Sequence, residues 1–283
     1  MKLANVAGRA TVLVSDVEGI DVEKASDGVF GPDLPSIYAD WEAFRSWASS
    51  ASTRSTVPVP RDELAAPSPE PRQILAIGLN YAEHAAESGF DVPDTLPPTF
   101  TKFVSALSGP DTTVALPDGG RTDWEVELVV VIGRTARRIP SADAWAHVAG
   151  VTVGQDLSER ITQTSGPAAQ FSLGKSFAGF APTGPWLVTP DELPNRDDLA
   201  LGGRVNGETV QDGRTRDLIF PVPALISALS HVVTLYPGDL IFTGTPAGVG
   251  HGRTPPRYLA LGDRLDSWIE GVGELHQKFT GAA

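Results

Sequence analysis

The sequence predicts an α+β fold in which β-strands predominate, with a small α/β domain preceding a larger one. The chain of 283 residues is long enough for one large domain and one small domain. The proline-rich stretch AAPSPEPRQ, residues 65–73, has the composition of a linker, and the pattern changes after it. Beyond it, apolar runs and turns follow each other without the strand–helix rhythm of a Rossmann or (β/α)8 fold. We therefore expect a small N-terminal domain over residues 1–66 and the larger domain over residues 73–283.

The first 66 residues carry one strand signal and one helix signal. The run from Ala10 to Val14 is apolar and β-branched, which is typical of a strand. The stretch from Ile37 to Ala51 has the spacing of apolar residues that an amphipathic helix shows.

Apolar runs predict the strands of the second part. WEVELVVVIG, residues 124–133, alternates and then becomes wholly apolar, as a strand entering a covered sheet would. The other runs that predict strands are ILAIGL at 74–79, VTVGQDL at 151–157 and LIFTG at 240–244.

Two helices are expected in the same part. VPALISALSHVV, residues 222–233, is amphipathic. The shorter NYAEHAAES begins at Asn80, a plausible N-cap residue, and Gly89 after it is a C-terminal stop signal.

Composition and charge exclude several classes of protein. The formal net charge is −13 and no basic cluster interrupts it, so we expect neither nucleic-acid nor anionic-membrane binding. No uninterrupted apolar stretch reaches 18 residues, and the N-terminus lacks the pattern of a secretory signal. The absence of cysteine excludes disulfides and thiolate chemistry. We expect a cytoplasmic protein.

The first candidate for chemistry is the pair Glu125 and Glu127. On a strand, residues two apart point to the same face, so two glutamates in an apolar strand repel each other. A divalent cation would compensate this repulsion. The alternative is that both lie on the solvated outer face of an antiparallel strand.

Asp156 supplies a third carboxylate where another apolar strand ends. Three carboxylates make an oxygen-only site that suits Mg²⁺, Mn²⁺ or Ca²⁺ rather than zinc or copper. They leave positions for water and a bidentate substrate, as in a catalytic site. The alternative for Asp156 alone is a turn or capping residue.

His84 and Glu87 lie three residues apart in the short predicted helix and therefore share a face. A carboxylate beside an imidazole fixes its tautomer and makes it a better base for activating water. The alternative is an exposed pair on the helix surface that contributes little to stability.

Lys175 and a glycine-rich loop are the remaining candidates. Lys175 lies in the apolar, glycine-rich stretch SLGKSFAGFAPTGP and needs an anionic partner there, either a carboxylate or a substrate oxyanion. The loop TGTPAGVGHG, residues 243–252, does not fit a dinucleotide-binding motif, but its backbone amides could face an anion. Motifs of serine hydrolases and zinc peptidases are missing from the sequence.

Seven segments follow one another from about Gln73 to the end of the chain: AIGLNYAEHAAESG, PTFTKFVSALSGP, DWEVELVVVIG, VTVGQDLSER, FSLGKSFAGFAPTGPWLVT, VNGETVQDG and YPGDLIFTGTPAGVG. Taken together and in this order, they resemble the fumarylacetoacetate hydrolase family. The spellings GQD and QFSLGKSF are similar to members that cleave sugar-derived 2,4-dioxo acids, whereas Ala178 departs from the aspartate of many relatives.

The resemblance implies a mixed β-roll catalytic domain, a homodimer and a bound Mg²⁺ or Mn²⁺, with Ca²⁺ also compatible with the ligands. It also implies a role for each matching residue. These are Glu125, Glu127 and Asp156 as metal ligands, His84 and Glu87 as a dyad on a lid, Lys175 as a catalytic cation, and Arg160, Gln163 and Thr245 as contacts to the substrate.

The reaction so implied is the metal-dependent hydrolysis of a C–C bond in a small 2,4-dioxo acid, an acylpyruvate or a sugar-derived diketo acid. The products would be pyruvate, or a related 2-oxo acid, and a carboxylic acid. His84, assisted by Glu87, would deprotonate the attacking water, and Lys175 would stabilise negative oxygens. The alternatives on the same site are oxaloacetate-type decarboxylation and the isomerisation or hydration of unsaturated 2-oxo acids. A metal-binding scaffold without catalysis is a third.

Overall fold

The structure, a computed structural model, describes residues 1–50 and 55–281. Ala51, the last residue of the predicted N-terminal helix, lies outside the described residues, as do residues 282 and 283 at the end of the predicted second domain.

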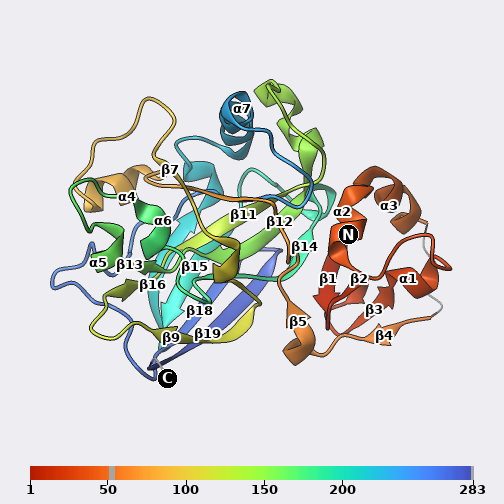
Figure 1. The fold of residues 1–283 in the computed structure, drawn as a ribbon, viewed down its shortest axis with the longest axis horizontal. Coiled ribbons are helices and arrows are strands. Elements are labelled where there is room, and N and C mark those ends of the chain that lie inside the picture. Colours follow the sequence, from red (N-terminus) through yellow and green to blue (C-terminus); the bar gives the residue numbers. More distant parts are fainter. Residues whose placement is uncertain (51–54, 282–283) are drawn as a thin grey trace.

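One large mixed sheet runs through the molecule (Figure 1). Its apolar central strands pair antiparallel, and the sheet continues on one side into the N-terminal region. In spatial order its strands are β4 (Val57–Pro58), β3 (Glu18–Asp21), β2 (Arg9–Ser15), β1 (Lys2–Val6), β14 (Ala181–Val188), β12 (Val148–Gln155), β11 (Val126–Ile132), β17 (Leu240–Phe242), β6 (Ile74–Ile77) and β7 (Thr99–Thr101), with β5 (Leu64–Ala65) pairing with β1 and β8 (Leu107–Ser108) pairing with β14.

A second sheet packs against the central strands and closes the roll. Strands β12 and β14 of the first sheet contact β19 of the second. Buried aliphatic and aromatic side chains fill the space between the sheets. The strands of the second sheet, in order, are β16 (Glu208–Arg214), β15 (Ala200–Val205), β18 (Arg264–Ile269), β19 (Gly273–Gly281) and β9 (Asp111–Leu116), and a separate pair is β10 (Thr122–Asp123) with β13 (Ser158–Glu159).

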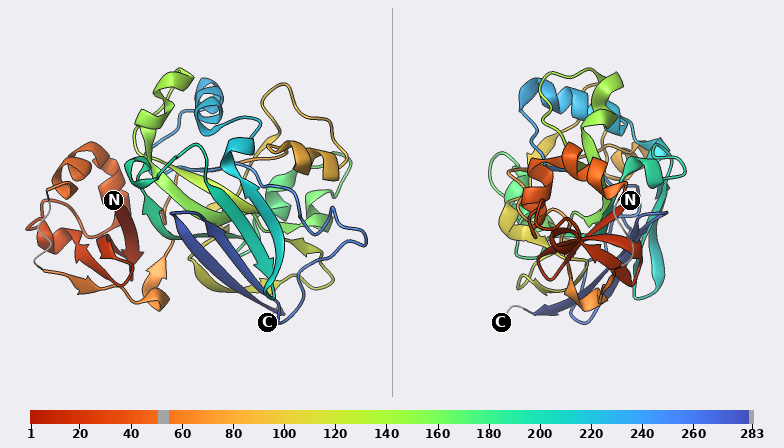
Figure 2. Two further views of the ribbon diagram at one scale, coloured as in Figure 1. Left: turned by 180° about the vertical axis from the view of Figure 1, so that it is seen from behind. Right: turned by 90° about the vertical axis from the view of Figure 1, so that its right-hand side faces the viewer.

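The N-terminal residues form a lobe at one end of the molecule (Figures 1 and 2). Its helices α1 (Val22–Ala25), α2 (Leu34–Ala39) and α3 (Trp41–Ala48) enclose buried aromatic side chains. The continuous helix predicted from Ile37 is wrong, because Asp40 adopts φ −133° and ψ 53° and separates α2 from α3. The lobe is tied to the rest by the pairing of β1 with β14. A domain boundary at Ala66 stays a prediction.

The strands predicted from apolar runs are confirmed, and the remaining helices lie on the larger part of the molecule. Within the described residues, no helix is long and apolar enough to cross a membrane. The α-helices are α4 (Ala82–Glu87), α5 (Arg160–Gln163), α6 (Phe171–Gly174) and α7 (Val222–Val232), and the 3₁₀ turns are η1 (Arg61–Glu63), η2 (Val104–Ala106), η3 (Ser141–His147), η4 (Pro190–Glu192) and η5 (Thr215–Asp217).

The start of α4 differs from the prediction. Tyr81 rather than Asn80 occupies the N-cap position. The Asn80 side chain instead accepts a hydrogen bond from the Phe220 amide at 2.8 Å and donates one to the Thr243 carbonyl at 2.8 Å. It therefore joins three segments that are distant in sequence. The predicted stop at Gly89 is confirmed, since this residue follows the helix with φ +78°.

Replacing Gly154 tests how tightly the central strands pack. A Cβ at this position would collide with Val129 and Phe242, so we expect Gly154→Ala to lower the free energy of unfolding by about 1–3 kcal/mol. Gly203→Ala is the matched control, because the nearest atom to its Cβ would lie at 3.8 Å, and its effect should stay below about 1 kcal/mol. Urea denaturation of both variants measures the difference. Equal stabilities would contradict this account of the packing.

Candidate active site

Three carboxylates meet where β11 begins and β12 ends. Antiparallel pairing sets Val126 opposite Gln155, and the Asp156 amide donates to the Glu125 carbonyl at 2.9 Å. Glu125, Glu127 and Asp156 are 5%, 1% and 0% exposed, and each offers an oxygen within 4.8 Å of the others. The alternative that the two glutamates lie on a solvated outer face is therefore wrong.

Three cations surround this cluster. Lys175 donates to both Glu125 and Asp156 at 2.7 Å, which identifies carboxylates as the partners that its burial requires. Lys102 donates to Asp156 at 2.5 Å, and Arg160 contacts Glu125 at 2.7 Å. Burial lowers the pKa of Lys175, but attraction to Asp156 and Glu125 outweighs this effect and raises it. Burial lowers the pKa of Lys102, with Asp156 opposing the shift.

Glu127 is the carboxylate that these cations leave uncompensated. Among the described residues, no lysine or arginine nitrogen lies within 4.0 Å of its oxygens, and its recorded partner is the Gly244 amide at 2.7 Å. Burial, together with Asp156 and Glu125, raises its pKa well above the ordinary value. Burial also acts to raise the pKa of Glu125, but Lys175 and Arg160 overcome it and hold that pKa low. The cluster therefore fits a divalent cation that prefers oxygen ligands, such as Mg²⁺ or Mn²⁺.

The glycine-rich loop of residues 243–252 directs its backbone amides at the protein's own carboxylates. The Gly244 amide donates to Glu127, the Gly248 amide to Glu87 at 2.9 Å, and the Gly250 amide to Asp123 at 2.7 Å. Gly244 and Gly248 have φ values of +102° and +106°, which side chains rarely adopt. This loop therefore connects three carboxylates around the site.

His84 and Glu87 form a pair on α4. The His84 Nδ1 lies 2.7 Å from a Glu87 oxygen, and Glu87 also accepts the Gly248 amide. His84 is 7% exposed, so the alternative of a fully solvated surface pair is wrong. An ionised carboxylate only accepts hydrogen bonds, so the neutral imidazole carries its proton on Nδ1 and leaves Nε2 as an acceptor.

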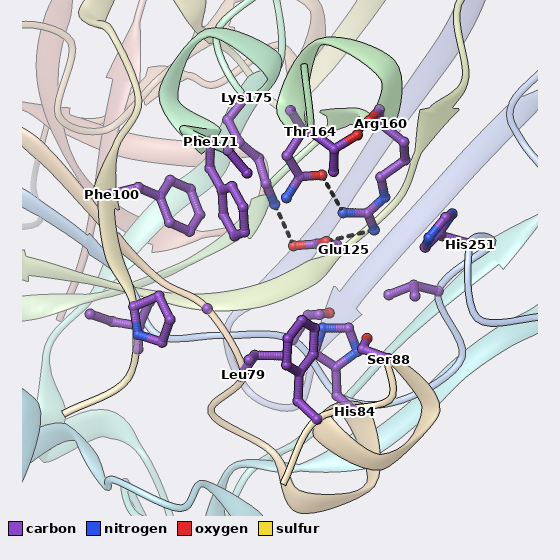
Figure 3. Close-up of a pocket in the computed structure, with 18 of the residues that line it drawn as sticks. Leu79, His84, Ser88, Phe100, Glu125, Arg160, Thr164, Phe171, Lys175 and His251 are labelled. Atoms are coloured by element: carbon purple, nitrogen blue, oxygen red, sulfur yellow. Dashed lines mark hydrogen bonds and ion pairs between the residues drawn. The ribbon is translucent and has the colours of Figure 1, made fainter. Parts of the chain in front are cut away.

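A cavity of about 690 Å³ brings these groups together. In Figure 3, His84 lies on one side of it, and Lys175, Arg160 and Glu125 lie on the other. Gln163 and Thr245 also line the cavity. The other predicted residues contact residues that line the cavity: Glu87 is bonded to His84, while Glu127 and Asp156 are clustered with Glu125.

Two of the predicted contact residues are themselves held in place. Arg160 donates to Gln163 at 2.9 Å and to Asp123 at 2.7 Å. The Thr245 hydroxyl donates to the Val126 carbonyl and accepts from Gln211. Their positions are thus fixed before any ligand binds.

Four residues of the site were not predicted from the sequence: Lys102, Asp123, Gln155 and Gln211. Asp123 is fully buried and joins Arg160 to the loop at Gly250. Gln155 and Gln211 accept the amides of Glu125 and Val126, both at about 2.8–2.9 Å. A weak signal existed for two of them: Lys102 is one of only five lysines, and Asp123 stands two residues before Glu125.

The comparisons with known proteins agree on one family. The model described as fumarylacetoacetate (FAA) hydrolase, C-terminal, matches residues 73–280. A mitochondrial oxaloacetate tautomerase of Homo sapiens is 42% identical over 256 residues, covering 88% of this chain and 81% of the relative. The 2,4-didehydro-3-deoxy-L-rhamnonate hydrolase of a Sphingomonas strain is 47% identical over 208 residues, covering 73% and 72%.

Two solved structures share the whole fold. A Mycobacterium smegmatis protein described as HpcE is 55% identical, with a TM-score of 0.96 and full coverage of both chains. The maleylpyruvate hydrolase of Sphingobium, solved with manganese and pyruvate, is 30% identical with a TM-score of 0.79 and full coverage of both chains.

Removing Lys102 tests the charge balance of the cluster. In Lys102→Met, a fully buried carboxylate loses one of its cations, and we expect the free energy of unfolding to fall by about 3 kcal/mol in a chelator-containing buffer. Lys24→Met removes an exposed lysine whose contact to Asp21 is long, at 3.6 Å, and Asp21 keeps Arg9 as a partner, so the change should cost less than about 1 kcal/mol. Denaturant unfolding compares the two variants. A cost for Lys102→Met no larger than that of the control would show that Asp156 does not depend on it.

Proposed function

The chain belongs to the fumarylacetoacetate hydrolase family, and we propose that it is a divalent-metal-dependent hydrolase that cleaves a C–C bond in a small 2,4-dioxo acid. The products are pyruvate, or a related 2-oxo acid, and a carboxylic acid. The observation that carries this proposal is the His84–Glu87 pair across the cavity from the carboxylate cluster.

The metal would be held by Glu125, Glu127 and Asp156. When bound, it would supply a positive charge that binds the 2-oxo acid end of the substrate and draws electron density toward it. The acidic cluster and the manganese in the Sphingobium relative support this assignment. Mg²⁺ and Mn²⁺ are both compatible with an all-oxygen ligand set.

Side chains at the cavity carry out the proton transfer, stabilise the developing charge and position the substrate. His84 takes a proton from a water molecule at Nε2, while Glu87 keeps the imidazole oriented and stabilises its charged form. The hydroxide so formed adds to the carbonyl remote from the 2-oxo acid. The C–C bond beside that carbonyl then breaks, which releases the carboxylic acid, and the electron pair of the bond forms an enolate of the 2-oxo acid that takes back the proton held by His84. Lys175 and Arg160 supply positive charge beside the oxygens that become negative. Gln163 and Thr245 position the substrate, and the apolar wall limits access of other water molecules.

A second candidate function is keto–enol tautomerisation of oxaloacetate. It is favoured by the human relative, whose similarity extends over 88% of this chain. Tautomerisation needs only that His84 move a proton between carbon and oxygen, with no attack by water. A homodimer and a cytoplasmic address remain predictions from the sequence.

A substrate panel distinguishes the two reactions. The protein is incubated with Mg²⁺ or Mn²⁺ and with acylpyruvates, 2,4-dioxo sugar acids or oxaloacetate, and the release of pyruvate, acid and CO₂ is measured beside the enol absorbance. We expect pyruvate and a second acid in equal amounts, abolished by chelator. Loss of enol absorbance without pyruvate would assign a tautomerase, and pyruvate with CO₂ from oxaloacetate alone would assign a decarboxylase.

Two substitutions separate proton transfer from metal binding. His84→Ala should lower kcat by at least about 100-fold but leave Mn²⁺ affinity unchanged, since it removes the base and none of the carboxylates. Glu127→Gln should weaken Mn²⁺ binding, which calorimetry measures without turnover. Glu83→Gln, on the same helix with an exposed side chain, is the control and should behave as the wild type. Hydrolysis that survives in His84→Ala would exclude the dyad as the source of the nucleophile.

A further inference from the structure

The mouth of the cavity contains a cation that the reaction above does not use. Arg121 lines the cavity together with His251, and both are exposed. Over residues 1–50 and 55–281, no carboxylate oxygen lies within 4.0 Å of the Arg121 guanidinium. Lys175 and Arg160, the other lysine and arginine side chains that line the cavity, are each bonded to two carboxylates.

Arg121 differs in this respect from the other arginines nearby. Arg253 and Arg257, which follow His251 in the chain, both contact Glu208, at 3.8 and 3.2 Å. In a protein with a net charge of −13, an unpaired cation at a cavity mouth provides local attraction for an anion.

Tyr258 connects Arg121 with His251. The Arg121 guanidinium lies 5.9 Å from the Tyr258 ring centroid, and the Tyr258 hydroxyl lies 2.9 Å from His251 Nδ1. When this hydroxyl donates to Nδ1, the neutral imidazole carries its proton on Nε2, as a hydrogen-bond donor. The three side chains thus offer a guanidinium fork and a further donor, which match a carboxylate.

The backbone beneath this group is fixed to the rest of the site. The Arg121 amide donates to Glu159 at 2.7 Å, and the Arg121 carbonyl accepts from the Arg160 amide. The His251 amide donates to Asp123 at 2.9 Å, and the same Asp123 oxygen accepts from the Arg160 side chain. The two ends of the cavity are therefore held in a constant relation to each other.

We infer that Arg121, with His251 and Tyr258, forms a subsite for a second carboxylate at the end of the substrate remote from the 2-oxo acid. The substrate class is then a dicarboxylic 2,4-dioxo acid rather than one with a neutral tail. A cavity of about 690 Å³ has room for a substrate that reaches from the carboxylate cluster to the mouth. The inference rests on the proposed function, because it takes the 2-oxo acid end to bind at that cluster.

The test uses pairs of unreactive 2-oxo acids that differ only in the terminal group. In the presence of Mn²⁺, calorimetry compares 2-oxoglutarate, 2-oxoadipate and 2-oxoheptanedioate with 2-oxo monocarboxylates of equal length. We expect one dicarboxylate to bind about 10- to 100-fold more tightly than its partner, as one charge-assisted contact allows. Arg121→Gln should remove this preference and leave the affinity for monocarboxylates unchanged within about twofold.

Arg257→Gln is the matched control, because it removes an equal charge from the same region without touching the cavity. It should retain the preference. The subsite would be overturned if, in the wild type, every dicarboxylate bound no more tightly than the monocarboxylate of equal length. It would also be overturned if Arg121→Gln weakened the binding of dicarboxylates and monocarboxylates by the same factor. Because binding is measured without turnover, a dicarboxylate preference in a protein that cleaves no dioxo acid would refute the proposed hydrolysis alone. Failure to bind any 2-oxo acid would overturn both.

Discussion

The structure depends on burying four carboxylates close together in the roll. Asp123, Glu125, Glu127 and Asp156 are all at most 5% exposed, while Lys102, Lys175 and Arg160 supply three positive charges. Charges in such a place are costly unless they are paired and hydrogen-bonded. The fourth carboxylate, Glu127, has no cationic partner among the described residues, and its pKa is raised. A divalent cation would compensate its charge, which gives this cluster its capacity for a metal.

The neighbouring elements are arranged around that constraint. Amides of the 243–252 loop donate to Glu127, Glu87 and Asp123. One segment therefore fixes the relative positions of the carboxylate cluster, the His84–Glu87 pair and Asp123, the partner of Arg160. Glutamine side chains complete the hydrogen bonding of the backbone where β11 begins. Preorganisation of this kind lowers the reorganisation needed when substrate binds.

Features set by residues close together in the sequence were predicted correctly, whereas features set by distant parts of the chain were not. The strands 126–132 and 148–155 were predicted because their apolar runs are continuous, and the stop at Gly89 because helix ends have local rules. Asn80 was assigned a local capping role, but its partners are Phe220 and Thr243. Asp40 likewise breaks a helix whose apolar spacing continues across it.

The family, the mostly β fold and the acidic residues Glu125, Glu127 and Asp156 could be predicted from the sequence, because they depend on local patterns and on the order of motifs. The tertiary structure was needed to show that Lys102 and Asp123 belong to the site, and that Glu127 and Arg121 have no oppositely charged side chain beside them within residues 1–50 and 55–281. Each of these facts concerns which charges face each other. Charge pairing in a roll is set by strand register and by loops that return from distant parts of the chain, and no spacing in the sequence records it.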